Sequence, residues 1–204
     1  MPDATTSFTG VLRPEEDYDG LSFRGLDLTS ARATSSRFLD CAVEECDLSG
    51  AQLAGSRWTD SSLLRVRGVG SDLSDASLLD VEVTDARLGA VAAYGSTWRR
   101  VTVRGGKVDF LNLRGATLRE VRFEDSLLVE PDFGDATLRD VSFSGSTLVG
   151  PQFRGATLTS VDLSEARLVE PKGLTSLRGA TVSRVQLLEL ADAFADQLGI
   201  TVRS

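Results

Sequence analysis

The sequence predicts an all-β solenoid, because two short periods run through most of its 204 residues. Apolar side chains recur at every fifth position from Phe23 to Leu168, and Gly68 is the clear exception. A second series, two residues earlier in each unit, is almost entirely small. Neither series matches the 3.6-residue period of a helix or the two-residue period of a flat strand. A fixed short period of this kind is typical of a solenoid.

Four five-residue units make one coil, because a twenty-residue period is superimposed on the shorter one. Pro131, Pro151 and Pro171 follow this spacing. Two further series do the same: Val81, Val101, Val121, Val141 and Val161, and Thr97, Thr117, Thr137 and Thr157. Equivalent residues are therefore expected to stack coil upon coil around a four-sided interior.

The repeat covers residues 21–175, and the two flanking segments are expected to cover its ends. Residues 1–20 are interpreted as a partly ordered N-terminal cap, since exposed strand edges invite aggregation. Residues 176–204 are expected to form a strand from Leu177, a helix at about 184–198 and a tail. Ser183 is a good N-cap and Gly199 a good C-terminal stop. The apolar stripe of this helix consists of Leu187, Leu190, Ala191, Phe194 and Leu198.

The large-residue series predicts the interior of the solenoid. Trp58 and Trp98 belong to it and share a column with Phe38, so they are expected to pack in the core and not to stack on nucleic-acid bases. Gly68, and Ala33 or Ala93, stand where a large side chain is expected. These positions predict locally thinner packing.

Composition argues against most enzyme classes. The chain has no histidine, the commonest general base and a common metal ligand. Cys41 and Cys46 occupy small-residue positions, which indicates buried side chains, not a disulfide framework or a zinc site. Gly105 and Gly106 lie inside the repeat, and no phosphate-binding motif follows them. We therefore expect no catalytic activity, no cofactor and no metal.

The net charge and the amino-terminal residues limit the partners and the cellular location that we expect. The formal net charge is −8, with 30 acidic against 22 basic residues, which argues against direct binding of duplex nucleic acid. No apolar run approaches the length of a membrane span, and Met1 is followed by no basic or apolar leader. The expected location is the cytoplasm.

Three five-residue units carry a resemblance to a known family. Ala116-Thr-Leu-Arg-Glu, Cys46-Asp-Leu-Ser-Gly and Ala156-Thr-Leu-Thr-Ser resemble the pentapeptide-repeat motif, A(D/N)LXX. The resemblance covers about three quarters of the chain. It implies a right-handed quadrilateral β-helix, here of about eight coils with a C-terminal α-helix.

One outward column is acidic along most of its length. At twenty-residue spacing it contains Asp40, Asp60, Asp80, Glu120 and Asp140, with Arg100 as the single interruption. We call these five carboxylates the acidic ladder. Stacked strands are ~4.8 Å apart, so the charges repel one another. A neighbouring column of Arg99, Arg119 and Arg139 is expected to neutralise Glu120 and Asp140 in part. A solvated face that maintains solubility is the alternative interpretation.

The family resemblance implies a partner. Similar members bind DNA gyrase or topoisomerase IV as DNA mimics and form homodimers through their C-terminal ends, here Leu187, Leu190, Phe194 and Leu198. The loops that interrupt the coils of many quinolone-protection members are absent, which makes the loopless mimics the closer comparison. The alternative is a protein-interaction scaffold with no topoisomerase target. The locally basic residues 99–122 are interpreted as surface charge variation or as a contact for an acidic partner.

Overall fold

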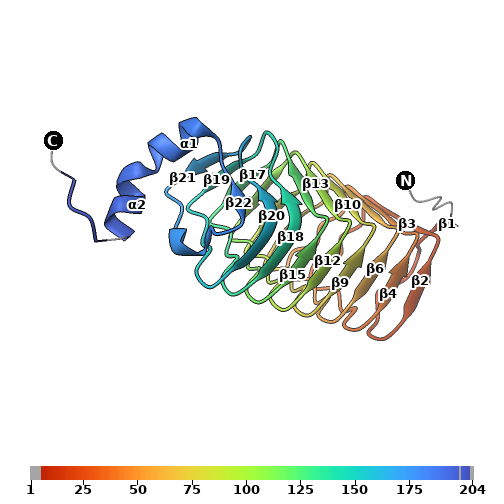
Figure 1. Ribbon diagram of the computed structural model, residues 1–204. Coiled ribbons are helices and arrows are strands. Elements are labelled where there is room, and N and C mark those ends of the chain that lie inside the picture. Colours follow the sequence, from red (N-terminus) through yellow and green to blue (C-terminus); the bar gives the residue numbers. More distant parts are fainter. Residues whose placement is uncertain (1–5, 198, 203–204) are drawn as a thin grey trace.

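The computed structural model describes residues 6–197 and 199–202 and forms a four-sided parallel β-solenoid of about eight coils (Figure 1). The chain winds from one end of the rod to the other, with its two helices at the C-terminal end. Trp58 pairs with Phe38 in the coil before and with Leu78 in the coil after. This register confirms the twenty-residue coil predicted from the sequence.

Strands form on three sides of the rod, although on the third side they begin only at β8 (Arg67–Val69). The first side contains β2 (Asp17–Asp19), β4 (Arg37–Leu39), β6 (Arg57–Thr59), β9 (Ser77–Leu79), β12 (Thr97–Arg99), β15 (Thr117–Arg119) and the first halves of β18 (Thr137–Ser142) and β20 (Thr157–Asp162). The second contains β1 (Thr6–Ser7), β3 (Leu21–Arg24), β5 (Ala42–Glu44), β7 (Ser62–Leu64), β10 (Glu82–Thr84), β13 (Thr102–Arg104), β16 (Arg122–Glu124), the second halves of β18 and β20, and β22 (Ala180–Thr181). The third contains β8 (Arg67–Val69), β11 (Arg87–Gly89), β14 (Lys107–Asp109), β17 (Leu127–Val129), β19 (Thr147–Val149) and β21 (Arg167–Val169). Isolated parallel bridges, from Arg32↔Gln52 to Gln152↔Lys172, join the coils on the fourth side.

The chain turns each corner through a residue in the left-handed conformation. Positive φ recurs at the fifth position of nearly every unit from Glu15 to Glu170. Glycine adopts this conformation freely, and aspartate tolerates it better than most residues. The corner N–H donates to the next coil, as from Asp40 N to Thr59 O at 3.0 Å. The backbone therefore explains why Gly and Asp are common at the fifth position.

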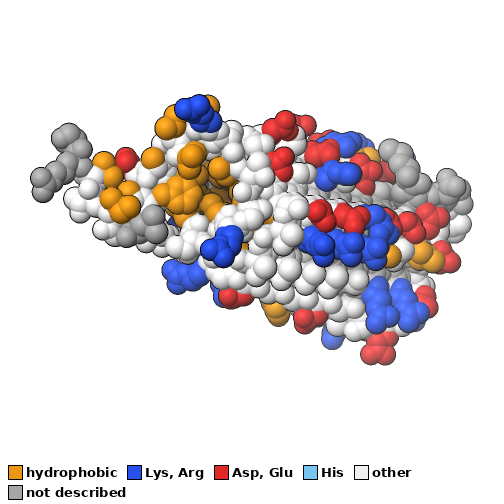
Figure 2. Space-filling view, viewed as in Figure 1, with side chains coloured by type: hydrophobic (Ala, Val, Ile, Leu, Met, Phe, Trp, Pro, Cys, Tyr) orange, Lys and Arg blue, Asp and Glu red, His pale blue; other side chains and the backbone are white. Residues whose placement is uncertain are grey.

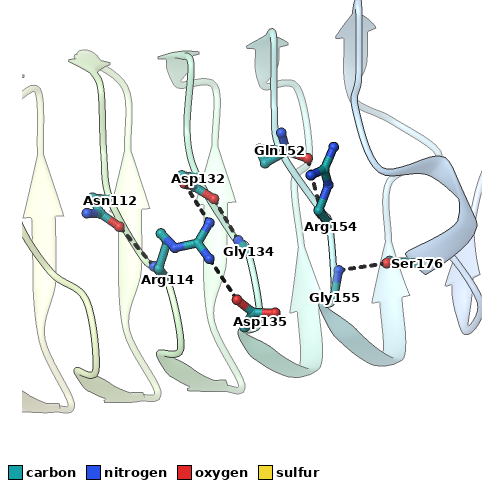
Figure 3. Close-up of polar contacts among 9 residues, drawn as sticks. All are labelled: Asn112, Arg114, Asp132, Gly134, Asp135, Gln152, Arg154, Gly155 and Ser176. Carbon is teal, nitrogen blue, oxygen red and sulfur yellow. Dashed lines mark hydrogen bonds and ion pairs between the residues drawn. The ribbon is translucent and has the colours of Figure 1, made fainter.

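Side-chain turns explain the second residue of the repeat motif. On the fourth side, Asp132 Oδ1 accepts a hydrogen bond from Gly134 N at 2.8 Å, and Asn112 Oδ1 accepts one from Arg114 N at 3.1 Å (Figure 3). Asp47 on the third side accepts from both the N–H and the hydroxyl of Ser49, at 3.0 and 2.6 Å. An Asp or Asn at this position satisfies a backbone donor inside the turn.

The turn at Asp47 predicts an acid-sensitive contribution to stability. The hydrogen bonds from Ser49, with a further one from Arg67 Nε, lower the pKa of Asp47 to about 2. Because the folded pKa lies below the unfolded one, this stabilisation is present above pH ~4 and is lost as the pH falls toward 2. The free energy of unfolding should therefore depend less on pH in this range for Asp47→Asn than for the wild type. Parallel pH profiles of the two proteins would contradict the assignment.

The interior contains the large-residue series, as predicted. Phe123 stacks on Phe143 with ring centroids 4.9 Å apart, and Phe133 stacks on Phe153 at 5.3 Å. Both tryptophans are buried, which confirms their assignment to the core. The free cysteines Cys41 and Cys46 are also buried, and burial raises the pKa of each thiol, so both are structural side chains.

The solenoid begins earlier than predicted. β2 lies inside the segment expected to be a cap and pairs in register with β4. Tyr18 takes the inward position of this coil and stacks on Phe38 at 4.9 Å. β1 pairs with β3 and covers part of the first edge. The five-residue series thus extends back to Tyr18, because an aromatic ring fills the interior as well as an aliphatic side chain does.

The C-terminal helix predicted over 184–198 is instead two helices. After the 3₁₀ turn Leu174–Ser176, α1 spans Arg184–Glu189 and α2 spans Ala191–Gln197, with Leu190 between them in a non-helical conformation. Ser183 is the N-cap and Gly199 follows with positive φ, both as predicted. Leu190 is buried, whereas Leu187 is exposed, so the predicted residues do not form one exposed stripe. Leu198 lies outside the described residues.

Candidate partner-binding surface

The fold brings the acidic ladder together along one edge of the rod, between its first and second sides. The strands that precede the ladder are in register, with Leu39 beside Thr59 and Thr59 beside Leu79. Each ladder residue is the corner residue that follows such a strand. Their φ angles lie in the left-handed region, from 48° at Asp60 to 57° at Glu120. The column that the sequence predicts is therefore a continuous edge of the molecule.

Arginines contact the ladder carboxylates Asp80, Glu120 and Asp140. Arg100 contacts Asp80 in a bidentate ion pair, with Nε–Oδ1 at 2.5 Å and Nη2–Oδ2 at 2.6 Å. These hydrogen bonds hold the pKa of Asp80 below its usual value. Arg119 contacts Glu120 at 3.1 Å, and Arg139 contacts Asp140 at 3.7 Å. The predicted neutralisation of Glu120 and Asp140 is confirmed.

A shallow groove runs beside the ladder on the second side. It has a volume of about 470 Å³ and is lined by three ladder carboxylates together with Glu82, Arg100 and Arg104. Arg104 lies between two carboxylates, at 3.7 Å from Glu82 and 2.8 Å from Glu124. The groove is therefore a surface of mixed charge, suited to charged groups of a macromolecule more than to a small apolar ligand.

Most basic residues of the segment 99–122 form ion pairs, either within a coil or between coils. Arg114 reaches the next coil and contacts Asp132 and Asp135, with the shorter distance, 2.7 Å, to Asp135 (Figure 3). Lys107 contacts Asp109 at 2.9 Å. The segment thus contributes cations to ion pairs on several sides, and not a single basic patch. Figure 2 likewise shows acidic and basic side chains interspersed on the visible face of the coils.

An exposed apolar surface lies at the C-terminal end, where Figure 2 shows hydrophobic side chains gathered near the helices. On α1, Val185, Leu187 and Leu188 are 65%, 51% and 71% exposed. Of the residues predicted for dimerisation, Phe194 packs against the core of its own chain, and Leu190 is buried. Val185 and Leu188 were missed because the sequence was read as one helix with one apolar face.

Within residues 6–197 and 199–202, no group of three or more Cys, Asp or Glu side chains has an arrangement that could hold a metal ion. None of the helices in these ranges has the length and apolar character that a membrane crossing requires.

Comparison with curated proteins finds no significant match. Among solved structures, the chain is similar to full-length QnrB1, described as a plasmid-mediated fluoroquinolone resistance protein. The identity is 17% and the TM-score 0.39, over 90% of this chain and 100% of that one. It is also similar to HetL from the cyanobacterium Nostoc sp. strain PCC 7120, described as involved in heterocyst differentiation regulation. There the identity is 15% and the TM-score 0.36, over 84% of this chain and 91% of that one.

The family described as pentapeptide repeats matches residues 46–88, 110–145 and 136–170, in 8 copies. These ranges make up more than half of the sequence and lie within the coils of the solenoid. The chain therefore belongs to the pentapeptide-repeat family.

Proposed function

We propose that the protein is a non-enzymatic DNA mimic that binds a type II topoisomerase, DNA gyrase or topoisomerase IV, through the acidic ladder. The proposal combines the family membership with the geometry of one edge of the rod. Binding would place the ladder against basic residues that otherwise contact DNA phosphates, and would alter the activity or the quinolone sensitivity of the enzyme.

The distribution of glycine among the four edges carries the proposal. All four edges turn through left-handed residues, which glycine adopts most easily. Glycine recurs along the other three edges, for example at Gly105, Gly150 and Gly155, but the ladder edge has none between residues 40 and 160. Backbone conformation by itself therefore does not account for the carboxylates there, and selection for surface charge does.

The spacing of the charges suits a surface that normally binds DNA. Adjacent coils place carboxylates ~4.8 Å apart, comparable with the ~3.4 Å per phosphate of one DNA strand. A line of charge on a rigid rod steers association with a basic surface, and this steering weakens as the salt concentration rises.

A protein-interaction scaffold without a topoisomerase target is the second candidate. The ion pairs of Asp80, Glu120 and Asp140 favour it, because they reduce the net charge of the ladder. On this alternative, the mixed charges are there for solubility and for joining the coils.

A supercoiling assay with purified gyrase separates the two candidates. We expect inhibition at micromolar protein, and a roughly tenfold weaker inhibition for the triple variant Asp40→Ser, Asp60→Ser and Asp80→Ser, because three charges are removed from the contact. No effect of the wild-type protein on gyrase or topoisomerase IV would leave the scaffold as the better interpretation.

The chain offers a matched control for this experiment. Asp75, Asp85 and Asp125 have φ of 55°, 52° and 50°, close to the 51°, 48° and 54° of Asp40, Asp60 and Asp80, but they lie on other edges. Replacing these three with Ser changes the net charge and the corner backbone equally. Equal loss of inhibition in both triple variants would contradict a role specific to the ladder.

We also propose that two copies associate through α1. Val185, Leu187 and Leu188 form an apolar surface on α1, which lies at the C-terminal end of the coils. Pairing of two such ends would bury these side chains and leave the ladder edges accessible, so that the acidic surface of the dimer would be twice as long.

Association through α1 predicts that the mass of the protein in solution changes when apolar residues of this helix are replaced. Light scattering should give twice the chain mass for the wild type, and a concentration-dependent shift toward the monomer for Leu187→Ser with Leu188→Ser, since burial of the two leucines of each copy contributes about 3–6 kcal/mol per copy. Leu39→Ser, which changes an exposed leucine on the side of the rod, is the control. A monomeric wild type would exclude the dimer.

A further inference from the structure

A shallow hollow lies on the outer surface of the third side, over β8, β11 and β14. Its volume is about 480 Å³, and its lining includes Val69, Arg87, Leu88, Gly89 and Lys107. Gly68, where the sequence predicts thin packing, also lines it. The acidic ladder follows the edge between the first and second sides and contributes no residue to this lining. The hollow therefore belongs to a separate surface of the molecule.

Gly89 leaves a gap between Val69 and Asp109, its neighbours in the adjoining strands. The fold does not require a glycine here, because the φ of Gly89 is not in the left-handed region. A Cβ at this position would lie 3.6 Å from the nearest atom, Val69 Cγ2, which is an ordinary contact. Valine fills the same column farther along the rod, at Val129 and Val149. A glycine that weakens a strand in this way often marks a place where a ligand or another chain approaches closely.

Arg87 places a positive charge beside this gap. It is in register with Arg67 on one side and Lys107 on the other, so three cations stack ~4.8 Å apart and repel one another. Arg67 contacts Asp47, and Lys107 contacts Asp109, both at 2.9 Å. Within the described part of the chain, Arg87 forms no ion pair. An anion at the hollow would therefore meet an available guanidinium and would reduce the repulsion between the cations.

The geometry of β11 relates the charge to the gap. Arg87 and Gly89 are two residues apart on one face of the strand, a distance of ~6.6 Å. An extended peptide has the same repeat, so a peptide along β11 can place a carboxylate over Arg87 and a large apolar side chain over Gly89. An aromatic ring can cover a strand glycine in this way. Val69, which is 66% exposed, and the partly buried Leu88 provide apolar contacts for the ring.

Other classes of ligand fit the hollow less well. Its lining contains no aromatic ring on which a nucleotide base could stack. Sites for small molecules usually enclose most of the ligand surface, whereas this hollow is shallow and lies on a flat sheet. Its charged residues are Arg87, Lys107 and Asp109, and two of these three would repel a metal ion.

We propose that the third side binds an extended acidic segment of a partner protein. A carboxylate of this segment pairs with Arg87, and a large apolar side chain two residues away packs against Gly89, Leu88 and Val69. Because the hollow and the acidic ladder lie on separate surfaces, this contact does not depend on the proposed binding of a topoisomerase.

A synthetic peptide tests the proposal directly. The probe is Thr-Thr-Glu-Thr-Phe-Thr-Thr with blocked ends, in which the glutamate and the phenylalanine lie on one face of an extended chain. In a nuclear magnetic resonance titration of the whole protein, the amide signals of Val69, Leu88 and Gly89 should shift saturably, with a dissociation constant of about 1 mM or lower. An isomer with adjacent glutamate and phenylalanine should bind roughly tenfold more weakly, because its two side chains point to opposite faces. Absence of saturable shifts, or equal affinity of the isomer, would overturn the proposal.

Gly89→Val separates peptide binding from folding. Valine fills the gap beside Val69 and suits a strand better than glycine does. The variant should therefore have a melting temperature about 2–4 °C higher than the wild type and should no longer bind the peptide. Unchanged peptide affinity in this variant would place the ligand elsewhere and would also overturn the proposal.

Two arginine variants test the charge contact. Arg87→Gln should weaken peptide binding roughly tenfold. Arg57 is the matched control, because it is likewise exposed, begins the strand β6 and forms no ion pair among the described residues. Arg57→Gln should leave the affinity unchanged. Equal weakening in the two variants would mean that general charge attraction, and not a contact at the hollow, holds the peptide.

Discussion

Replacing Phe143 with alanine should lower the free energy of unfolding by about 3–5 kcal/mol. The ring is fully buried, stacks on Phe123 at an interplanar angle of 4° and meets Phe133 edge-on at 5.8 Å. The substitution removes these contacts and leaves a cavity that neighbouring coils cannot close, because their strands are held in register on both sides. Chemical denaturation of the two proteins measures the difference.

Phe110 provides the matched control for this experiment. It lies at a corner with φ of 53° and is 55% exposed. Phe110→Ala should change the free energy of unfolding by no more than about 0.5 kcal/mol, as at other exposed sites. Phe110→Gly should stabilise the protein by about 1 kcal/mol, since glycine adopts left-handed backbone without strain. Similar losses for Phe143→Ala and Phe110→Ala would show that inward position does not determine stability in this rod.

Replacing Gln186 with leucine should destabilise the C-terminal end by about 2–4 kcal/mol. Gln186 Nε2 donates to Leu163 O and Ala166 O, both at 2.6 Å, and the Gln186 side chain forms a capping box with Ser183. In earlier coils the equivalent carbonyl accepts from the backbone of the next coil, as Ser146 O does from Arg167 N at 2.8 Å. The amide of Gln186 thus replaces a strand that a further coil would provide.

The loss of stability in Gln186→Leu should affect the C-terminal end before the rest of the rod, because each coil of a solenoid contacts only the neighbouring coils. Hydrogen exchange should therefore rise first in α1 and in β20, with smaller changes near Phe38. Gln197→Leu, at an exposed position of α2, is the matched control and should leave exchange in β20 unchanged. Slow exchange in α1 of the Gln186→Leu protein would mean that apolar packing, not this amide, holds the helix.

The sequence predicted the coil, its interior and the line of the acidic ladder, because each depends only on the positions of residues in a five-residue period. The ends were predicted less well. Tyr18 continues the inward series before the segment where the repeat was recognised. The helix predicted over 184–198 is divided at Leu190, and Gln186 is bonded to the last coil; no period in the sequence encodes either feature.

The chemistry of the outer surface was predicted only in outline. In the sequence, Arg100 interrupts the acidic ladder. In the structure, it forms a bidentate ion pair with Asp80. The left-handed corners give many of the Asp residues a conformational explanation. The absence of glycine from the ladder edge between residues 40 and 160 is informative only when compared with the glycines at the other corners.

The five-residue period by itself determined which side chains of this protein point inward. Each five-residue unit turns one corner of the coil, so the position of a residue in its unit fixes the direction of its side chain. Stacking of the coils decided the rest. Stacking brings residues that are twenty positions apart in the sequence to a spacing of ~4.8 Å. Which of these neighbouring side chains form hydrogen bonds or ion pairs is decided only in the stacked coils. Trp58 and Trp98 occupy equivalent positions in the repeat, but within residues 6–197 and 199–202 one indole N–H has an acceptor and the other has none. Hydrogen-bond partners depend on the rotamers of the surrounding coils, and a repeat pattern does not specify them.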